Sequence, residues 1–84
     1  MKIYDRPDFQ GQAHELSEDV DSVQERFPHR DVASCRVVEG YWTLYEHSSY
    51  RGRQYFLGPG EYRKASDWGA VCNTAGSLRR VTDF

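Results

Sequence analysis

The strongest constraint on this chain is an internal repeat of about 40 residues. Residues 3–16 align with residues 44–57 at an offset of 41 positions. Both copies begin with an aliphatic residue, a tyrosine and an acid, and both continue with a second aromatic residue and a glycine. A further match, of residues 33–38 with residues 76–81, places a serine near the end of each copy. The chain is therefore predicted to be two copies of one structural unit.

The length limits how these copies can be organised. A chain of 84 residues and 9.8 kDa buries about 64% of its unfolded surface, enough for one hydrophobic core. We therefore expect one domain, residues 1–84, with motif 1 at about 1–40 and motif 2 at about 41–84. Leu, Ile and Val together number 12, the same as Phe, Trp and Tyr, so rings are expected to carry much of the core.

The local patterns favour strands over helices. Residues 42–45 and 54–57 are rich in aromatic and β-branched side chains, which is typical of strands. The polar segment 46–52 between them is predicted to be a folded hairpin loop. Only residues 19–27 show helical spacing, and Pro28 limits that segment to a short helix. Two similar four-stranded units predict an all-β fold in which two Greek key motifs form a β-sandwich.

Each copy is expected to fold its hairpin loop over itself. Two rings can stack across the loop, and a glycine can supply a positive φ or a close backbone approach. The later serine can hydrogen-bond the backbone of the loop and tie it down. In chain order these residues are Tyr4, Phe9, Gly11 and Ser34 in motif 1, and Tyr45, Tyr50, Gly52 and Ser77 in motif 2.

This repeated pattern, Tyr-x4-aromatic-x-Gly with a later serine, resembles the Greek key motif of the βγ-crystallin superfamily. The second half closely resembles the C-terminal domain of vertebrate lens γ-crystallins, and the resemblance covers nearly the whole chain. The residues that carry it are 38–46, 50–55, 59–63, 67–70 and 76–81. The resemblance implies a monomeric structural protein of the eye lens, highly soluble, refractive and without catalytic activity. It also implies the cytoplasm of the lens fibre cell as its location.

The resemblance gives structural roles to three further rings. Tyr62 is similar to the tyrosine corner, in which a hydroxyl bonds to nearby backbone and ties a Greek key crossover. Trp42 and Trp68 are expected to be core rings rather than ligand platforms.

The same resemblance implies a missing partner. Lens γ-crystallins have two such domains, so the chain looks like an isolated C-terminal domain whose N-terminal γ-crystallin domain is absent. The family's domains pair through a small apolar patch, and the matching positions are Thr43, Phe56 and Val81. Thr43 departs from the usual aliphatic residue, and the alternative is that these are ordinary surface side chains. Other crystallins are expected to make only weak, short-range contacts with the chain.

Many superfamily members bind calcium, and a non-lens calcium-binding module is the alternative function. The matching loops are residues 29–34 and 72–77, and their candidate ligands are Asp31, Ser34, Asn73 and Ser77. Calcium prefers six to eight oxygen ligands that include carboxylates, which neither loop offers, and Arg30 would repel the ion. We therefore expect no metal and no cofactor.

An enzyme is the third possibility, and the sequence shows no assembled catalytic set. The acids Glu18, Asp19, Asp21 and Glu25 are interpreted as a solvated face, with Asp19 or Asp21 capping the short helix. The three histidines, His14, His29 and His47, share no metal-ligand spacing. Cys35 aligns with Leu78 in the repeat, which favours a buried structural thiol, whereas Cys72 lies in a polar loop.

Charge and hydropathy argue against two other partner classes. The net charge is −2 and acids offset the arginines, so we expect no nucleic-acid partner. No apolar run approaches the roughly 18 residues of a membrane span, and the start of the chain lacks a signal-peptide pattern. No membrane association is expected.

Overall fold

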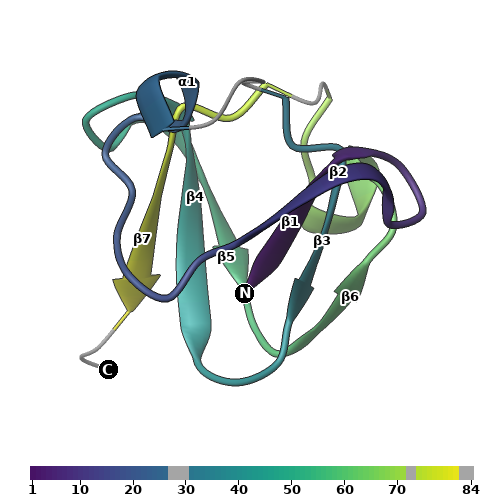
Figure 1. Cartoon of the computed structure of the whole chain (residues 1–84). Coiled ribbons are helices and arrows are strands. Elements are labelled where there is room, and N and C mark those ends of the chain that lie inside the picture. Colours follow the sequence, from purple (N-terminus) through teal and green to yellow (C-terminus); the bar gives the residue numbers. More distant parts are fainter. Residues whose placement is uncertain (27–30, 72–73, 82–84) are drawn as a thin grey trace.

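The structure, a computed structural model, describes residues 1–26, 31–71 and 74–81. Two antiparallel sheets face each other, and the predicted all-β sandwich is confirmed (Figure 1). Sheet A has the strand order β2-β1-β3-β6, and sheet B has the order β5-β4-β7. The strands are β1 (Lys2–Arg6), β2 (Gln10–Glu15), β3 (Ser34–Val37), β4 (Tyr41–His47), β5 (Arg51–Leu57), β6 (Gly60–Tyr62) and β7 (Ser77–Val81).

The two motifs exchange strands instead of forming separate sheets. Strand β6 belongs to motif 2, yet it pairs with β3 of motif 1, and the two run side by side in Figure 1. In return, Val20 of motif 1 forms a bridge with Leu78 of β7. The expectation of two four-stranded units holds for motif 2, which supplies β4 to β7. It is wrong for motif 1, whose described residues form three strands and only this bridge to sheet B, so sheet B has three strands.

Two short helical turns connect the strands: α1 (Val23–Arg26) and the 3-10 helix η1 (Ala65–Trp68). The hydroxyl of Ser22 accepts a hydrogen bond from the amide of Glu25 at 3.3 Å, so Ser22 caps α1. The expected cap by Asp19 or Asp21 is therefore wrong. Ser22 and Glu25 have the Ser-x-x-Glu spacing of a capping box, which was the sequence signal for this helix start. No helix in the described part of the chain is long and apolar enough to cross a membrane.

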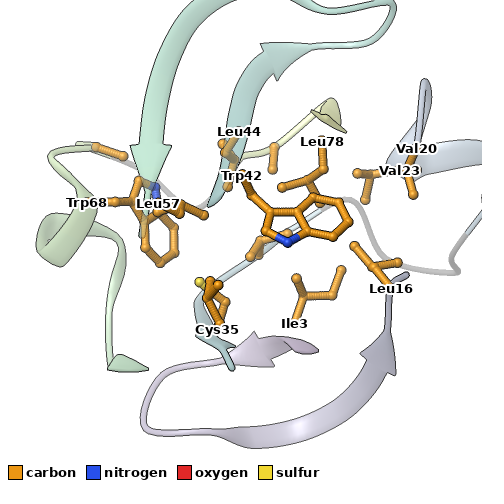
Figure 2. Close-up of a cluster of buried hydrophobic side chains, with 14 of the residues drawn as sticks. Ile3, Leu16, Val20, Val23, Cys35, Trp42, Leu44, Leu57, Trp68 and Leu78 are labelled. Carbon is orange, nitrogen blue, oxygen red and sulfur yellow. The ribbon is translucent and has the colours of Figure 1, made fainter. Parts of the chain in front are cut away.

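The core lies between the sheets, where alternate residues of each strand point inward. The indole of Trp42 lies among aliphatic side chains from both motifs, including Ile3 and Leu78 (Figure 2). Trp68 of η1 is also part of this cluster. The prediction that rings carry the core holds only in part, because the largest fully buried side chains are aliphatic: Leu44, Leu57, Leu78, Val20, Val23 and Val32.

Candidate functional site

The two hairpin loops are closed by the same set of contacts, which we name clasp 1 and clasp 2. In clasp 1, the Ser34 hydroxyl donates to the carbonyl of Arg6 at 2.6 Å and accepts from the amide of Phe9 at 3.0 Å. The Tyr4 and Phe9 rings meet edge to face, with centroids 5.5 Å apart. Ser34 is fully buried, so its hydroxyl satisfies backbone groups that water does not reach.

Clasp 2 repeats this geometry closely. The Ser77 hydroxyl donates to the carbonyl of His47 at 2.7 Å and accepts from the amide of Tyr50 at 3.0 Å. The Tyr45 and Tyr50 rings are also 5.5 Å apart and edge to face. An offset pair of this kind adds about 0.5–1.5 kcal/mol to the burial of its area.

The loop backbone is unusual at the tip of each hairpin. Asp8 and Phe9 have φ of 56° and 60°, and Ser49 and Tyr50 have φ of 59° and 58°. Residues other than glycine adopt this left-handed region at a cost of roughly 1–2 kcal/mol each. The serine and ring contacts of both clasps therefore hold a backbone shape that the chain alone disfavours.

An arginine lies over the outer ring of each clasp. The guanidinium carbon of Arg36 is 4.2 Å from the centroid of Phe9, and that of Arg79 is 5.5 Å from the centroid of Tyr50. Arg36 also pairs with Glu61 of β6 at 3.0 Å. Each clasp thus stacks an arginine on a ring pair, an arrangement that favours the planar guanidinium.

Each clasp is also tied to the other motif. In the β1–β2 hairpin (hairpin 1), the Asp8 amide donates to the carbonyl of Arg63 at 2.8 Å, just after β6 of motif 2. In the β4–β5 hairpin (hairpin 2), the Ser49 amide donates to the carbonyl of Asp21 at 2.7 Å, just after Val20 of motif 1. Each clasp is closed by residues of its own motif, and each hairpin loop gains one further backbone hydrogen bond from the other motif.

A separate contact lies at the turn before β6. The Tyr62 hydroxyl donates to the carbonyl of Gly58 at 2.9 Å, and the Tyr62 ring meets Trp68 edge to face at 6.3 Å. This joins the turn, β6 and η1 around one ring.

Two of the four candidate calcium ligands, Ser34 and Ser77, already use their hydroxyls in other contacts. Asp31 forms a β-bridge with Thr74, and the Ser34 and Ser77 hydroxyls belong to the clasps. Asn73 lies outside the described residues. In the part of the chain that the structure describes, no group of three or more His, Cys, Asp or Glu side chains could hold a metal ion.

The acidic residues near α1 do not form one site. Glu18 pairs with Arg26 at 3.7 Å, and the side chain of Asp19 accepts a hydrogen bond from the amide of Arg80 at 2.7 Å. Of the histidines, His47 pairs with Glu46 at 3.3 Å, whereas His14 lies on β2 and His29 falls outside the described residues.

Cys35 is fully buried at the position that aligns with Leu78. Burial raises the pKa of its thiol to about 12, so the nucleophilic thiolate is scarce at neutral pH. Its sulfur lies within the hydrophobic cluster (Figure 2). Cys35 is therefore a packing residue, and Cys72 lies outside the described residues.

The three predicted patch residues share the outer face of sheet B. Thr43 is paired with Phe56 of β5, and Val81 of β7 is paired with Tyr41. Phe56 is 58% exposed, and its ring stacks on that of Tyr41 at 5.3 Å. Tyr41 is a patch residue that the sequence analysis missed, although it alternates with inward-facing Trp42.

A family model described as Beta/Gamma crystallin matches residues 1–81, which include both clasps and both sheets. The chain belongs to the Beta/Gamma crystallin family.

Curated relatives of this crystallin are gamma-crystallins. It is 60% identical over 83 residues to Gamma-crystallin M2 of Chiloscyllium indicum, covering 99% of this chain and 47% of that protein. It is 57% identical over 84 residues to Gamma-crystallin A of Bos taurus, covering 100% of this chain and 48% of that protein. The chain spans about half the length of these relatives.

Solved structures of other crystallins share the fold. The beta gamma crystallin from Ciona intestinalis superposes with a TM-score of 0.90 at 24% identity, over 95% of this chain and 96% of that one. A betagamma-crystallin from an archaeon superposes with a TM-score of 0.86 at 29% identity, over 95% and 94% of the two chains. The sandwich with exchanged strands is therefore the fold of this crystallin family.

Proposed function

We propose that this crystallin is a structural constituent of the eye lens, a highly soluble refractive protein of the fibre-cell cytoplasm without catalytic activity. The observation that carries the proposal is the 60% identity to Gamma-crystallin M2 over 99% of the chain. The two clasps and the Tyr62 contact support the proposal, because their polar side chains bond to the protein's own backbone, as structural residues do. These side chains are Ser34, Ser77 and Tyr62. We further propose that residues 1–84 act as one domain of two motifs, at about 1–40 and 41–84.

The mechanism is physical. Arginine and aromatic side chains are highly polarisable, and each clasp packs an arginine over a ring, as Arg36 over Phe9 shows. The surface carries both signs of charge, and the net charge is −2, which favours dispersed molecules in a dense solution.

The test is optical and thermodynamic. We expect a refractive index increment above that of a control protein of equal mass that has fewer rings and arginines. Light scattering per molecule is expected to fall as the protein is concentrated, because repulsion and excluded volume order the solution. An ordinary refractive increment, or scattering that rises steeply with concentration, would contradict the proposal. Micromolar calcium affinity in a titration would instead favour the calcium-binding module.

We also propose that the chain pairs with a second γ-crystallin domain through the patch of Thr43, Phe56, Val81 and Tyr41. Two observations support the pairing: the relatives are about twice as long as this chain, and Phe56 is 58% exposed. An exposed aromatic pair on a sheet face is a surface that burial would stabilise. Contacts with other crystallins are proposed to stay weak and short-ranged.

Replacing Phe56 by alanine tests this pairing. The probe is the half of Bos taurus Gamma-crystallin A that this chain does not match, mixed with the chain and followed by sedimentation. We expect F56A to weaken the association about tenfold or more, because the ring is the largest exposed apolar surface of the patch. The matched control is V38A, since Val38 is 86% exposed but lies on the turn between β3 and β4. Equal loss in both variants, or no association at all, would overturn the pairing.

A further inference from the structure

The open side of β7 is covered by a short segment of motif 1, Ser17 to Val20, which we name the strap. Val20 and Leu78 exchange two backbone hydrogen bonds, at 2.8 and 2.9 Å. The next outward amide of β7, that of Arg80, donates to the side chain of Asp19 at 2.7 Å. The Arg80 guanidinium then donates to the carbonyl of Ser17 at 3.1 Å. Four hydrogen bonds thus hold the strap on β7.

The repeat shows what Asp19 replaces. In sheet A, β6 pairs with β3 through three successive residues, from Cys35 opposite Tyr62 to Val37 opposite Gly60. Cys35 and Val37 align with Leu78 and Arg80 of β7. In sheet B the strand pairing stops after Leu78, and a carboxylate instead of a strand faces the amide of Arg80. Asp19 therefore occupies the place of the missing fourth strand.

The edge of β7 needs such a cover more than the long edge strands β2 and β5 do, and the remaining edge strand, β6, has only three residues. The hairpins of β2 and β5 each contain a register shift, between Tyr4 and Arg6 and between Tyr45 and His47. Irregular edges of this kind resist pairing with another chain. Strand β7 pairs with β4 through five successive residues without a shift, so its far side is regular. A regular strand edge is a template for another strand.

We propose that Asp19 closes the β7 edge against strand addition by a second copy of this chain. Backbone amides can pair with a strand of any sequence. In a concentrated solution of this protein, the strand most often available to pair with β7 therefore belongs to another copy of the same chain. Asp19 and Arg80 are exposed, so the closure rests on the hydrogen bond and not on burial. This inference does not depend on the proposed lens function.

Three variants separate the hydrogen bond from the charge. D19A removes the acceptor, D19N removes the charge but keeps an oxygen at the same position, and E18A removes a neighbouring charge that faces Arg26. We expect D19A to raise the hydrogen-exchange rate of the Arg80 amide about tenfold or more, because this exposed amide loses its acceptor. D19N and E18A are expected to leave that rate within about threefold of the unchanged chain. The exchange of the Leu44 amide in β4 reports any general loss of stability.

Sedimentation then tests for the second copy, at about 0.15 M salt so that repulsion between the Arg79 and Arg80 side chains of two molecules is screened. We expect the average mass of D19A to rise with concentration, while D19N, E18A and the unchanged chain stay monomeric. If D19N behaves as D19A does, charge explains the effect and the proposal is wrong. The proposal is equally wrong if D19A exchanges slowly at Arg80, or exchanges fast and remains a monomer. If D19A does not fold, D19S can replace it, because serine keeps an oxygen on a shorter side chain. We expect its Arg80 exchange rate and its average mass to lie between those of D19A and D19N.

Discussion

Replacing Gly76 by alanine is expected to destabilise the domain by about 4 kcal/mol or more, the largest effect that we predict for one substitution. The added Cβ would overlap the carbonyl carbon and Cα of His47 and the amide nitrogen of Ser48. These are backbone atoms, so no side-chain rotation relieves the clash. The Gly76 amide also donates to the carbonyl of Tyr45 at 2.9 Å, so moving the chain away breaks a hydrogen bond next to clasp 2.

Urea unfolding followed by tryptophan fluorescence measures this loss. The matched control is G58A, because a Cβ at Gly58 meets only the ring of Tyr41, at 3.2 Å, and that ring is on the surface. We expect G58A to cost about 1 kcal/mol or less. A G76A variant as stable as G58A would show that the backbone of hairpin 2 moves freely, contrary to the tight closure of clasp 2.

Replacing Ser77 by alanine is expected to destabilise the domain by about 2–3 kcal/mol. The hydroxyl serves two backbone groups, the carbonyl of His47 and the amide of Tyr50. Alanine has nearly the same shape, so the loss comes from leaving these two groups without a partner at a buried position. S34A is expected to cost a similar amount, because Ser34 serves two groups in clasp 1.

Thermal unfolding followed by circular dichroism is a suitable measurement. In a domain of this size the expected loss lowers the melting temperature by about 10–20 °C. The control is S48A, since Ser48 lies exposed in the same hairpin loop and belongs to neither clasp. A fall of the same size in S48A would assign the effect to the loop itself, and no fall in S77A would remove the clasp as a source of stability.

Much of the local structure was predictable because each hairpin contains its own signal. The alternation around Trp42 and Leu44 predicts a half-buried strand, and both residues point into the core. The helix start was predictable too, but the capping box of Ser22 and Glu25 was overlooked in favour of Asp19 and Asp21. That error is one of choosing between neighbouring polar residues, each of which is a good cap by type.

The balance of the core was harder to predict. An equal number of rings and aliphatic residues suggested a core built from rings, whereas Leu44, Leu57 and Leu78 occupy its fully buried centre. Tyr4 and Tyr45 are also buried, but each is paired with a second ring in its clasp. Composition counts rings without showing whether they face the other sheet or a folded loop.

The sequence by itself determined the duplicated motif, the all-β class and the residue types that close each clasp, because these depend on residues within one motif. Only the tertiary structure decided which motif supplies each edge of each sheet. The amide of Ser49 reaches Asp21, and the amide of Arg80 reaches Asp19, across gaps of 28 and 61 positions. Backbone amides and carbonyls are nearly the same in every residue, so nothing in the repeat distinguishes strand pairing within a motif from strand exchange between motifs. Strand exchange is favoured because it buries the apolar faces of both sheets against each other. In sheet B, which has no fourth strand in the described residues, Asp19 then bonds to the open edge of β7.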